Sequence, residues 1–107
     1  MNQLEEKLSI VETTSSNFDE LKIIKNKLFN KNLISCAKIF GPIDVSYKWD
    51  GKIIDDKEFL LRLLSKTSFF QEIKEIIQKN HSYDVPEIIS FEINNSSTDY
   101  KKWALNI

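Results

Sequence analysis

The chain has 107 residues, with 15 lysines and arginines against 16 aspartates and glutamates, so its formal charge is -1 at neutral pH. This length suffices for one domain with a single core, and 41% hydrophobic with 29% charged residues is ordinary for a globular protein. The composition excludes a mainly disordered chain. The balanced charge gives no net attraction to nucleic acid or to an anionic membrane.

The N-terminal residues lack the basic and apolar regions of a secretory signal, and no apolar run approaches the roughly 18 residues that span a bilayer. The one cysteine, Cys36, cannot form an intramolecular disulfide, which favours a reducing compartment. We therefore expect a single domain over residues 1–107, frayed over residues 1–6. We expect it in the cytoplasm, with no nucleic-acid or membrane partner.

The first third of the chain predicts a strand and then a helix. Alternating residues 8–13 are typical of a short strand. Asn17 with Glu20 three residues later resembles a capping box, which predicts a helix ending near residues 30–32. Its expected apolar face, at helical spacing, consists of Leu21, Ile24 and Leu28.

The middle of the chain predicts a long two-stranded arm. Residues 33–40 are apolar and small, which predicts a strand buried on both faces, and Gly41-Pro42 predicts a bend or bulge after it. Apolar and polar residues then alternate strictly over residues 43–49. Asp50-Gly51 is a strong tight-turn dipeptide, so residues 52–64 are expected to return as the partner strand.

The last third predicts a helix, a strand and a short terminal helix. Ser68 followed by Gln71 resembles a second capping box, and the helix it begins should end around His81. Residues 87–93 predict a fourth strand, and residues 98–105 a terminal helix. The order is βαββαβ plus one helix, an α+β arrangement in which two helices cover one face of an antiparallel sheet.

The other face of this sheet, and the arm, have no cover within the chain. Exposed apolar surfaces and unpaired edges of this kind cause aggregation unless another subunit covers them. The pattern therefore favours self-association.

Four blocks of sequence carry a resemblance to a known family. They are Cys36 within residues 33–39, Ser46-Tyr47-Lys48-Trp49-Asp50-Gly51-Lys52-Ile53, residues 81–89 with Pro86-Glu87, and Asp99-Tyr100 with Trp103. On these blocks the chain resembles the CutA divalent-cation tolerance family over nearly its whole length. Ser82 departs from the family pattern, which has a proline there.

The resemblance implies a ferredoxin-like fold with a long hairpin and a short C-terminal helix, and a homotrimer built by strand extension between subunits. It also implies weak binding of copper or another divalent cation. A similar trimeric plan in nitrogen-regulatory signalling proteins suggests a sensor role. In such a trimer we expect inter-subunit clefts to contain Trp49, Lys52, Glu58 and Tyr83. We expect subunit packing to involve Val45, Tyr47 and Trp103.

The candidate metal ligands are His81, the only histidine, and Glu87 six residues later. Imidazole and carboxylate can share a metal ion, although further ligands would have to come from a neighbouring subunit or water. Alternatively, His81 caps the second helix, and Glu87 pairs with a lysine in a cleft. Some family members carry a cysteine, a proposed copper ligand, where this chain has Glu12, and a carboxylate favours harder ions.

Motifs of catalysis are absent from the sequence, which has no nucleophile elbow, no glycine-rich phosphate loop and no HExxH or CxxC. We therefore expect a binding protein rather than an enzyme. The alternative to a metal-binding trimer is a structural or adaptor trimer that displays its helices to a protein partner and binds metal only incidentally.

Overall fold

The computed structural model describes residues 6–107, so the predicted fraying of residues 1–6 falls almost entirely outside the described residues. The elements follow the predicted order, with one short 3₁₀ turn added before the second long helix. They are β1 (Leu8–Ser15), α1 (Phe18–Asn30), β2 (Cys36–Trp49), β3 (Lys52–Lys66), the 3₁₀ turn Thr67–Phe69, α2 (Phe70–Asn80), β4 (Ile88–Glu92) and α3 (Thr98–Leu105).

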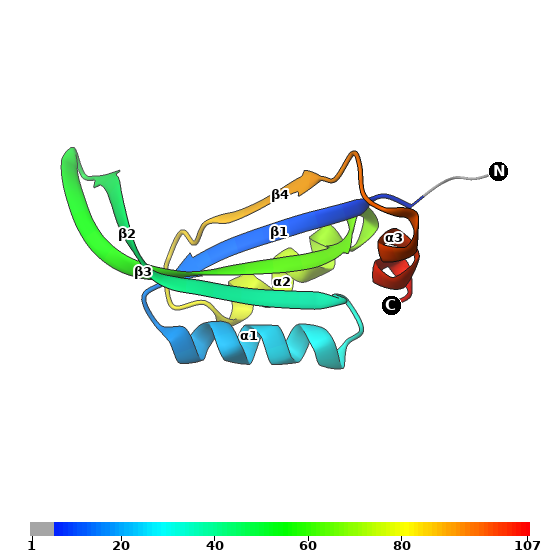
Figure 1. The fold of residues 1–107 in the computed structure, drawn as a ribbon. Helices are drawn as coiled ribbons and strands as arrows, with labels where there is room; N and C mark the ends of the chain where they lie inside the picture. Colours follow the sequence, from blue (N-terminus) through cyan, green and yellow to red (C-terminus); the bar gives the residue numbers. More distant parts are fainter. Residues whose placement is uncertain (1–5) are drawn as a thin grey trace.

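The four strands form one antiparallel sheet in the order β2-β3-β1-β4. Helices α1 and α2 lie together on one face of this sheet (Figure 1). The α+β class and the ferredoxin-like βαββαβ arrangement are confirmed.

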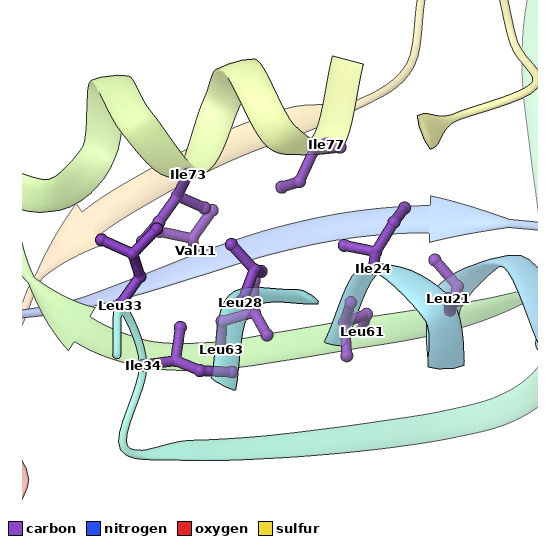
Figure 2. Packing of buried hydrophobic residues seen from close by; sticks show 10 residues of the cluster. All are labelled: Val11, Leu21, Ile24, Leu28, Leu33, Ile34, Leu61, Leu63, Ile73 and Ile77. Carbon is purple, nitrogen blue, oxygen red and sulfur yellow. The ribbon is translucent and has the colours of Figure 1, made fainter. Parts of the chain in front are cut away.

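The core lies between the helices and the sheet, where side chains from α1, α2, β1 and β3 meet (Figure 2). The predicted apolar face of α1 is confirmed, because Leu21, Ile24 and Leu28 are completely buried. Asn17 caps this helix, since its Oδ1 accepts from the Glu20 N–H at 3.1 Å. The reciprocal half of the capping box is not formed, because the Glu20 carboxylate accepts from Ser15 Oγ instead.

The predicted capping box at the start of α2 is wrong. Ser68 lies inside the 3₁₀ turn, and the cap position, Phe69, makes no side-chain hydrogen bond to the helix. The Ser68 hydroxyl instead donates to the carboxylate of Glu6. The helix is fixed by its buried face of Ile73 and Ile77, so packing rather than capping determines where it lies.

The prediction that residues 33–40 form a strand buried on both faces is also wrong. Leu33 and Ile34 are buried, but they precede the strand, which begins at Cys36. Strand β2 lies at the edge of the sheet, and Phe40 on it is 41% exposed. The predicted irregularity after it is confirmed, because the β2–β3 register shifts between Phe40 and Ile43.

The far halves of β2 and β3 form the predicted arm. A two-residue turn at Asp50 and Gly51, with φ values of 55° and 74°, brings Trp49 opposite Lys52. The arm curls away from the helix layer (Figure 1), and the chain measures 50 × 26 × 21 Å. The radius of gyration of the chain, 15.0 Å, exceeds the roughly 13 Å expected of a compact domain of this length. The arm is therefore an extension from the body.

The sheet face opposite α1 and α2 is only partly covered. Helix α3 closes one end, where Ala104 packs against Leu8 and Leu64. Along the rest of this open face, Ile89 and Phe91 are each 46% exposed, and Arg62 pairs with Glu12 at 2.8 Å. The expectation of an uncovered face therefore holds only for the part beyond α3.

Candidate functional site

An open pocket of about 810 Å³ lies where the arm curls over the body. The arm supplies one wall, and the end of β1 with the loop before β4 supplies the other. The lining residues are Thr14, Val45, Ser46, Tyr47, Trp49, Ile54, Glu58, Tyr83, Asp84, Val85, Pro86 and Glu87.

The arm wall is apolar and aromatic because of strand periodicity. Side chains two residues apart on β2 share a face, so Val45, Tyr47 and Trp49 all line the pocket. Ile54 lies directly opposite Tyr47 on β3 and joins the same surface. The alternation seen in the sequence therefore builds one continuous wall.

The rest of the lining contains several acidic residues, of which the first is Glu58 on β3. Glu58 is only 6% exposed, and its Oε2 accepts from the Tyr83 hydroxyl at 2.8 Å. The Tyr83 oxygen in turn accepts from the Ser16 N–H at 2.9 Å. Burial raises the pKa of Tyr83, and the adjacent Glu58 adds to that effect while the bonds to Ser16 oppose it. At neutral pH this phenol therefore acts as a hydrogen-bond donor that orients the Glu58 carboxylate.

Glu87 lines the same pocket and lies immediately before β4. Partial burial raises the pKa of this carboxyl, and repulsion from Glu12 and Glu58 raises it further. Asp84 adds a third carboxylate to the lining, and none of the described lining residues is basic. The pocket is therefore suited to positive charge.

His81 does not line the pocket but lies behind it, with its side chain completely enclosed. Its Nε2 lies 2.7 Å from the Thr14 carbonyl oxygen, and its Nδ1 accepts from the Tyr83 N–H at 3.1 Å. Together these contacts fit the neutral ring with its proton on Nε2. Metal ligation by His81 would require the ring to give up one of these contacts, and it stays a prediction.

Glu20 holds this loop from the other side and was not among the predicted site residues. Its carboxylate accepts from the Ser82 N–H at 3.0 Å and from Ser15 Oγ at 2.8 Å, and it lies 3.4 Å from His81 Nδ1. The sequence singled Glu20 out only as part of a local capping box. Its partner Ser82 is 62 residues away, and local spacing gives no signal for such a contact.

Most of the predicted site and packing residues converge on this pocket. The lining includes the predicted cleft residues Trp49, Glu58 and Tyr83, the metal candidate Glu87, and the packing candidates Val45 and Tyr47. Lys52, which follows the turn of the arm, is outside the lining. Trp103 lies on α3, where its ring centroid is 5.6 Å from that of Tyr100.

The described residues of one chain do not form a complete metal site. Within residues 6–107, no three His, Cys, Asp or Glu side chains are grouped so that they could hold a metal ion. A tightly held ion would therefore need ligands beyond these residues, such as water or groups from a second chain. The carboxylates of the pocket by themselves fit weak binding of a hard cation.

The comparisons with known proteins agree with this architecture. The family model described as CutA1 divalent ion tolerance protein matches residues 9–106. The chain belongs to the CutA1 divalent ion tolerance family. One family member, the divalent-cation tolerance protein CutA of Pyrococcus horikoshii, is 34% identical over 96 residues, covering 90% of this chain and 93% of that protein. A chloroplastic CutA protein of Arabidopsis thaliana is 33% identical over 97 residues, or 91% of this chain.

Solved CutA1 structures show the same fold. The CutA1 protein of Ehrlichia chaffeensis superposes with a TM-score of 0.86 at 29% identity, covering 94% of each chain. The chain spans about half the length of its CutA relatives from Arabidopsis thaliana and Danio rerio, at 53% and 51%. Among the described residues, no helix combines the length and apolar character needed to cross a membrane.

Proposed function

We propose that this CutA1 family member is a homotrimer that binds a divalent cation, copper or a similar ion, weakly in clefts between subunits and contributes to cation tolerance or sensing. The observation that carries the proposal is the acidic pocket beneath an arm that extends beyond the body of its own subunit. The pocket supplies negative charge, and the arm supplies surface for a neighbouring subunit.

Uncovered apolar surface supports the assembly. Trp49 is 56% exposed and Ile53 69% exposed on the arm, while Phe91 is 46% exposed on the open sheet face. Both edge strands, β2 and β4, have backbone groups free to pair with another chain. In a homotrimer, one type of interface that repeats three times would cover these surfaces on every subunit.

The acidic lining supports the cation. Glu58 and Glu87 are the ligands we propose within one chain, with the remaining positions taken by water or by a neighbouring subunit. Neighbouring carboxylates with no basic partner in the described lining favour a bound cation, because it relieves their mutual repulsion. His81 remains the predicted nitrogen ligand, and its present contacts give it at least a positioning role for Tyr83.

Cation binding is tested by titrating copper and zinc into wild type, His81→Ala, Glu87→Gln and the control Glu92→Gln. Glu92 lies at the end of β4, outside the pocket, and pairs with Lys7. The proposal expects Glu87→Gln to weaken binding while Glu92→Gln does not. If neither His81→Ala nor Glu87→Gln changes affinity or stoichiometry, the metal site is wrong.

The assembly is tested by sedimentation equilibrium, where we expect about three times the chain mass of 12.6 kDa. Phe91→Lys places charge on the open sheet face and should lower this mass. Phe29→Lys is the matched control, because Phe29 is 41% exposed on α1 at the other side of the molecule. A stable monomer at micromolar concentration contradicts the trimer.

The adaptor function gains support from one observation, the lack of three grouped metal ligands within the described residues. A trimer that forms as expected but shows no cation binding would favour it, with α1 and α2 displayed to a protein partner. In either case we propose a binding protein rather than an enzyme, in line with relatives named for cation tolerance. We also propose a cytoplasmic location, although two relatives are described as chloroplastic and one solved structure as periplasmic.

A further inference from the structure

We propose that Glu20 is the positioning residue of the loop between α2 and β4, and that its carboxylate holds this loop where Tyr83 reaches Glu58. The consequence for cation binding rests on the proposed function, because Glu58 is one of its proposed ligands. The link itself joins residues of one chain, so it does not depend on which surfaces a neighbouring subunit covers.

The Glu20 side chain lies between the start of α1 and the loop, and it is only 9% exposed. Its Oε1 accepts from the Ser82 N–H at 3.0 Å. Its Oε2 accepts from the hydroxyls of Ser82 at 3.2 Å and Ser15 at 2.8 Å. Within residues 6–107, no lysine or arginine forms an ion pair with this carboxylate. It therefore depends on these neutral donors to offset its lost hydration.

Helix capping does not account for these contacts. Asn17 already supplies the cap of α1, because its Oδ1 accepts from the Glu20 N–H. In a capping box the Glu20 side chain would turn back to the Asn17 N–H, but that group donates to Ser15 Oγ at 3.0 Å. The Glu20 carboxylate is thus free to bind the loop.

Tyr83 directly follows the residue that Glu20 holds. Its N–H donates to His81 Nδ1 at 3.1 Å, and its hydroxyl accepts from the Ser16 N–H and donates to Glu58. The backbone and the ring of Tyr83 are therefore fixed at separate points. A displaced loop would break the second of them and leave the Glu58 carboxylate without its oriented donor.

Glu20 joins the two segments that the Tyr83 hydroxyl also spans. One is the end of β1, where Ser15 bonds the carboxylate and the next residue, Ser16, bonds the phenol. The other is the loop, where Ser82 bonds the carboxylate and Tyr83 follows. The distance that the phenol must bridge is thus set by the Glu20 contacts.

Backbone hydrogen exchange in chelator tests this link without any metal. Glu20→Gln should speed exchange of the Ser82 amide about tenfold, since a hydrogen bond to a charged group is of that size, and the Tyr83 amide should follow. The amide of Leu63, in the core on β3, should keep its wild-type rate. Asp19→Asn is the matched control, because Asp19 is an exposed acidic residue in the same first turn of α1.

Ser82→Pro breaks the link from the other partner. Proline has neither the N–H nor the hydroxyl that bonds Glu20, and the extended backbone of His81, with φ of -94° and ψ of 140°, is suited to precede it. Ser82→Ala keeps the N–H and should change Tyr83 exchange less. Because both substitutions act on one link, Glu20→Gln combined with Ser82→Pro should speed Tyr83 exchange no more than either alone.

Three results would overturn the proposal. The first is unchanged exchange at Ser82 and Tyr83 in Glu20→Gln. The second is additive effects of Glu20→Gln and Ser82→Pro, which would mean that they act separately. The third is an equal rise at Leu63, which would show that Glu20 stabilises the whole fold rather than the loop.

Copper and zinc titrations of the same variants separate this inference from the proposed function. Glu20→Gln and Ser82→Pro should each weaken binding severalfold at an unchanged sedimentation mass, while Asp19→Asn should not. Wild type that binds neither metal rejects the proposed function, whereas the exchange rates still decide the role of Glu20. Metal binding that Ser82→Pro leaves unchanged would overturn the positioning of Glu58.

Discussion

Replacing His81 with alanine tests whether the ring supports the pocket loop or acts only as a metal ligand. The side chain is completely enclosed, and its two nitrogens contact the Thr14 carbonyl and the Tyr83 N–H. Losing a hydrogen bond costs about 0.5–1.5 kcal/mol, and leaving its partner buried and unsatisfied costs about 1–3 kcal/mol. The cavity left by the ring adds to the cost of these lost hydrogen bonds. We therefore expect His81→Ala to lower the free energy of unfolding by about 2–4 kcal/mol.

The assay is urea unfolding at one fixed protein concentration, because assembly contributes to apparent stability. His81→Gln can keep a donor toward Thr14 and should recover part of the loss. Gln78→Ala, exposed on the last turns of α2, should change stability by less than about 0.5 kcal/mol. All measurements are made with and without a chelator.

Two results would refute the structural role of His81. One is a free energy of unfolding for His81→Ala, measured in chelator, that lies within about 0.5 kcal/mol of the wild-type value, which is the range expected of a neutral surface change. The other is a stability loss seen only when copper is present, which would identify the ring as a ligand.

Two further predictions concern the pocket and the root of the arm. Folding raises the pKa of Glu87, so the folded state favours the protonated carboxyl. The stability associated with this group is fully present below the unfolded pKa of about 4.3 and is lost as pH rises through the folded pKa, where the carboxyl ionises. Thermal unfolding should therefore show Glu87→Gln more stable than wild type at neutral pH and equally stable in acid. The difference at neutral pH should be less than about 1 kcal/mol, because solvent screens this exposed group. A variant less stable than wild type at neutral pH contradicts the prediction. Alanine at Gly41 should destabilise the protein more than alanine at Gly51, although both glycines have positive φ. At Gly41 a Cβ would lie 2.9 Å from Phe59 and 3.0 Å from the Glu58 carbonyl oxygen, whereas at Gly51 nothing lies within 4 Å. Urea midpoints in the opposite order would show that backbone strain, not contact, limits the arm.

The features that the sequence predicted correctly depend on short-range spacing. Strict alternation with Asp50-Gly51 predicted the arm, because side-chain direction and turn geometry follow from adjacent residues. The buried face of α1 followed from helical spacing in the same way. These patterns also placed Tyr47 and Trp49 on one surface, which is half of the pocket.

The features that it missed depend on contacts between distant segments. Residues 33–40 have the same apolar character whether they form a central or an edge strand, and only the strand order determines their burial. Glu58 was expected in a cleft, but its burial was not, because the Tyr83 hydroxyl that bonds its carboxylate lies 25 residues further along the chain. His81 contacts a carbonyl group 67 residues away, which no local pattern predicts.

Glu12 connects these observations to the choice of cation. Arg62 bonds its carboxylate through Nε and NH2, both at 2.8 Å. A carboxylate bound to a guanidinium is a poor ligand for any metal ion, because metal binding would have to displace the arginine, and its oxygen donors do not favour a soft ion. Glu12 nevertheless raises the pKa of Glu87, so it still contributes negative potential to that end of the sheet. Glu12 therefore adds attraction for positive charge near the pocket without a thiol ligand, which favours an ion that prefers oxygen donors.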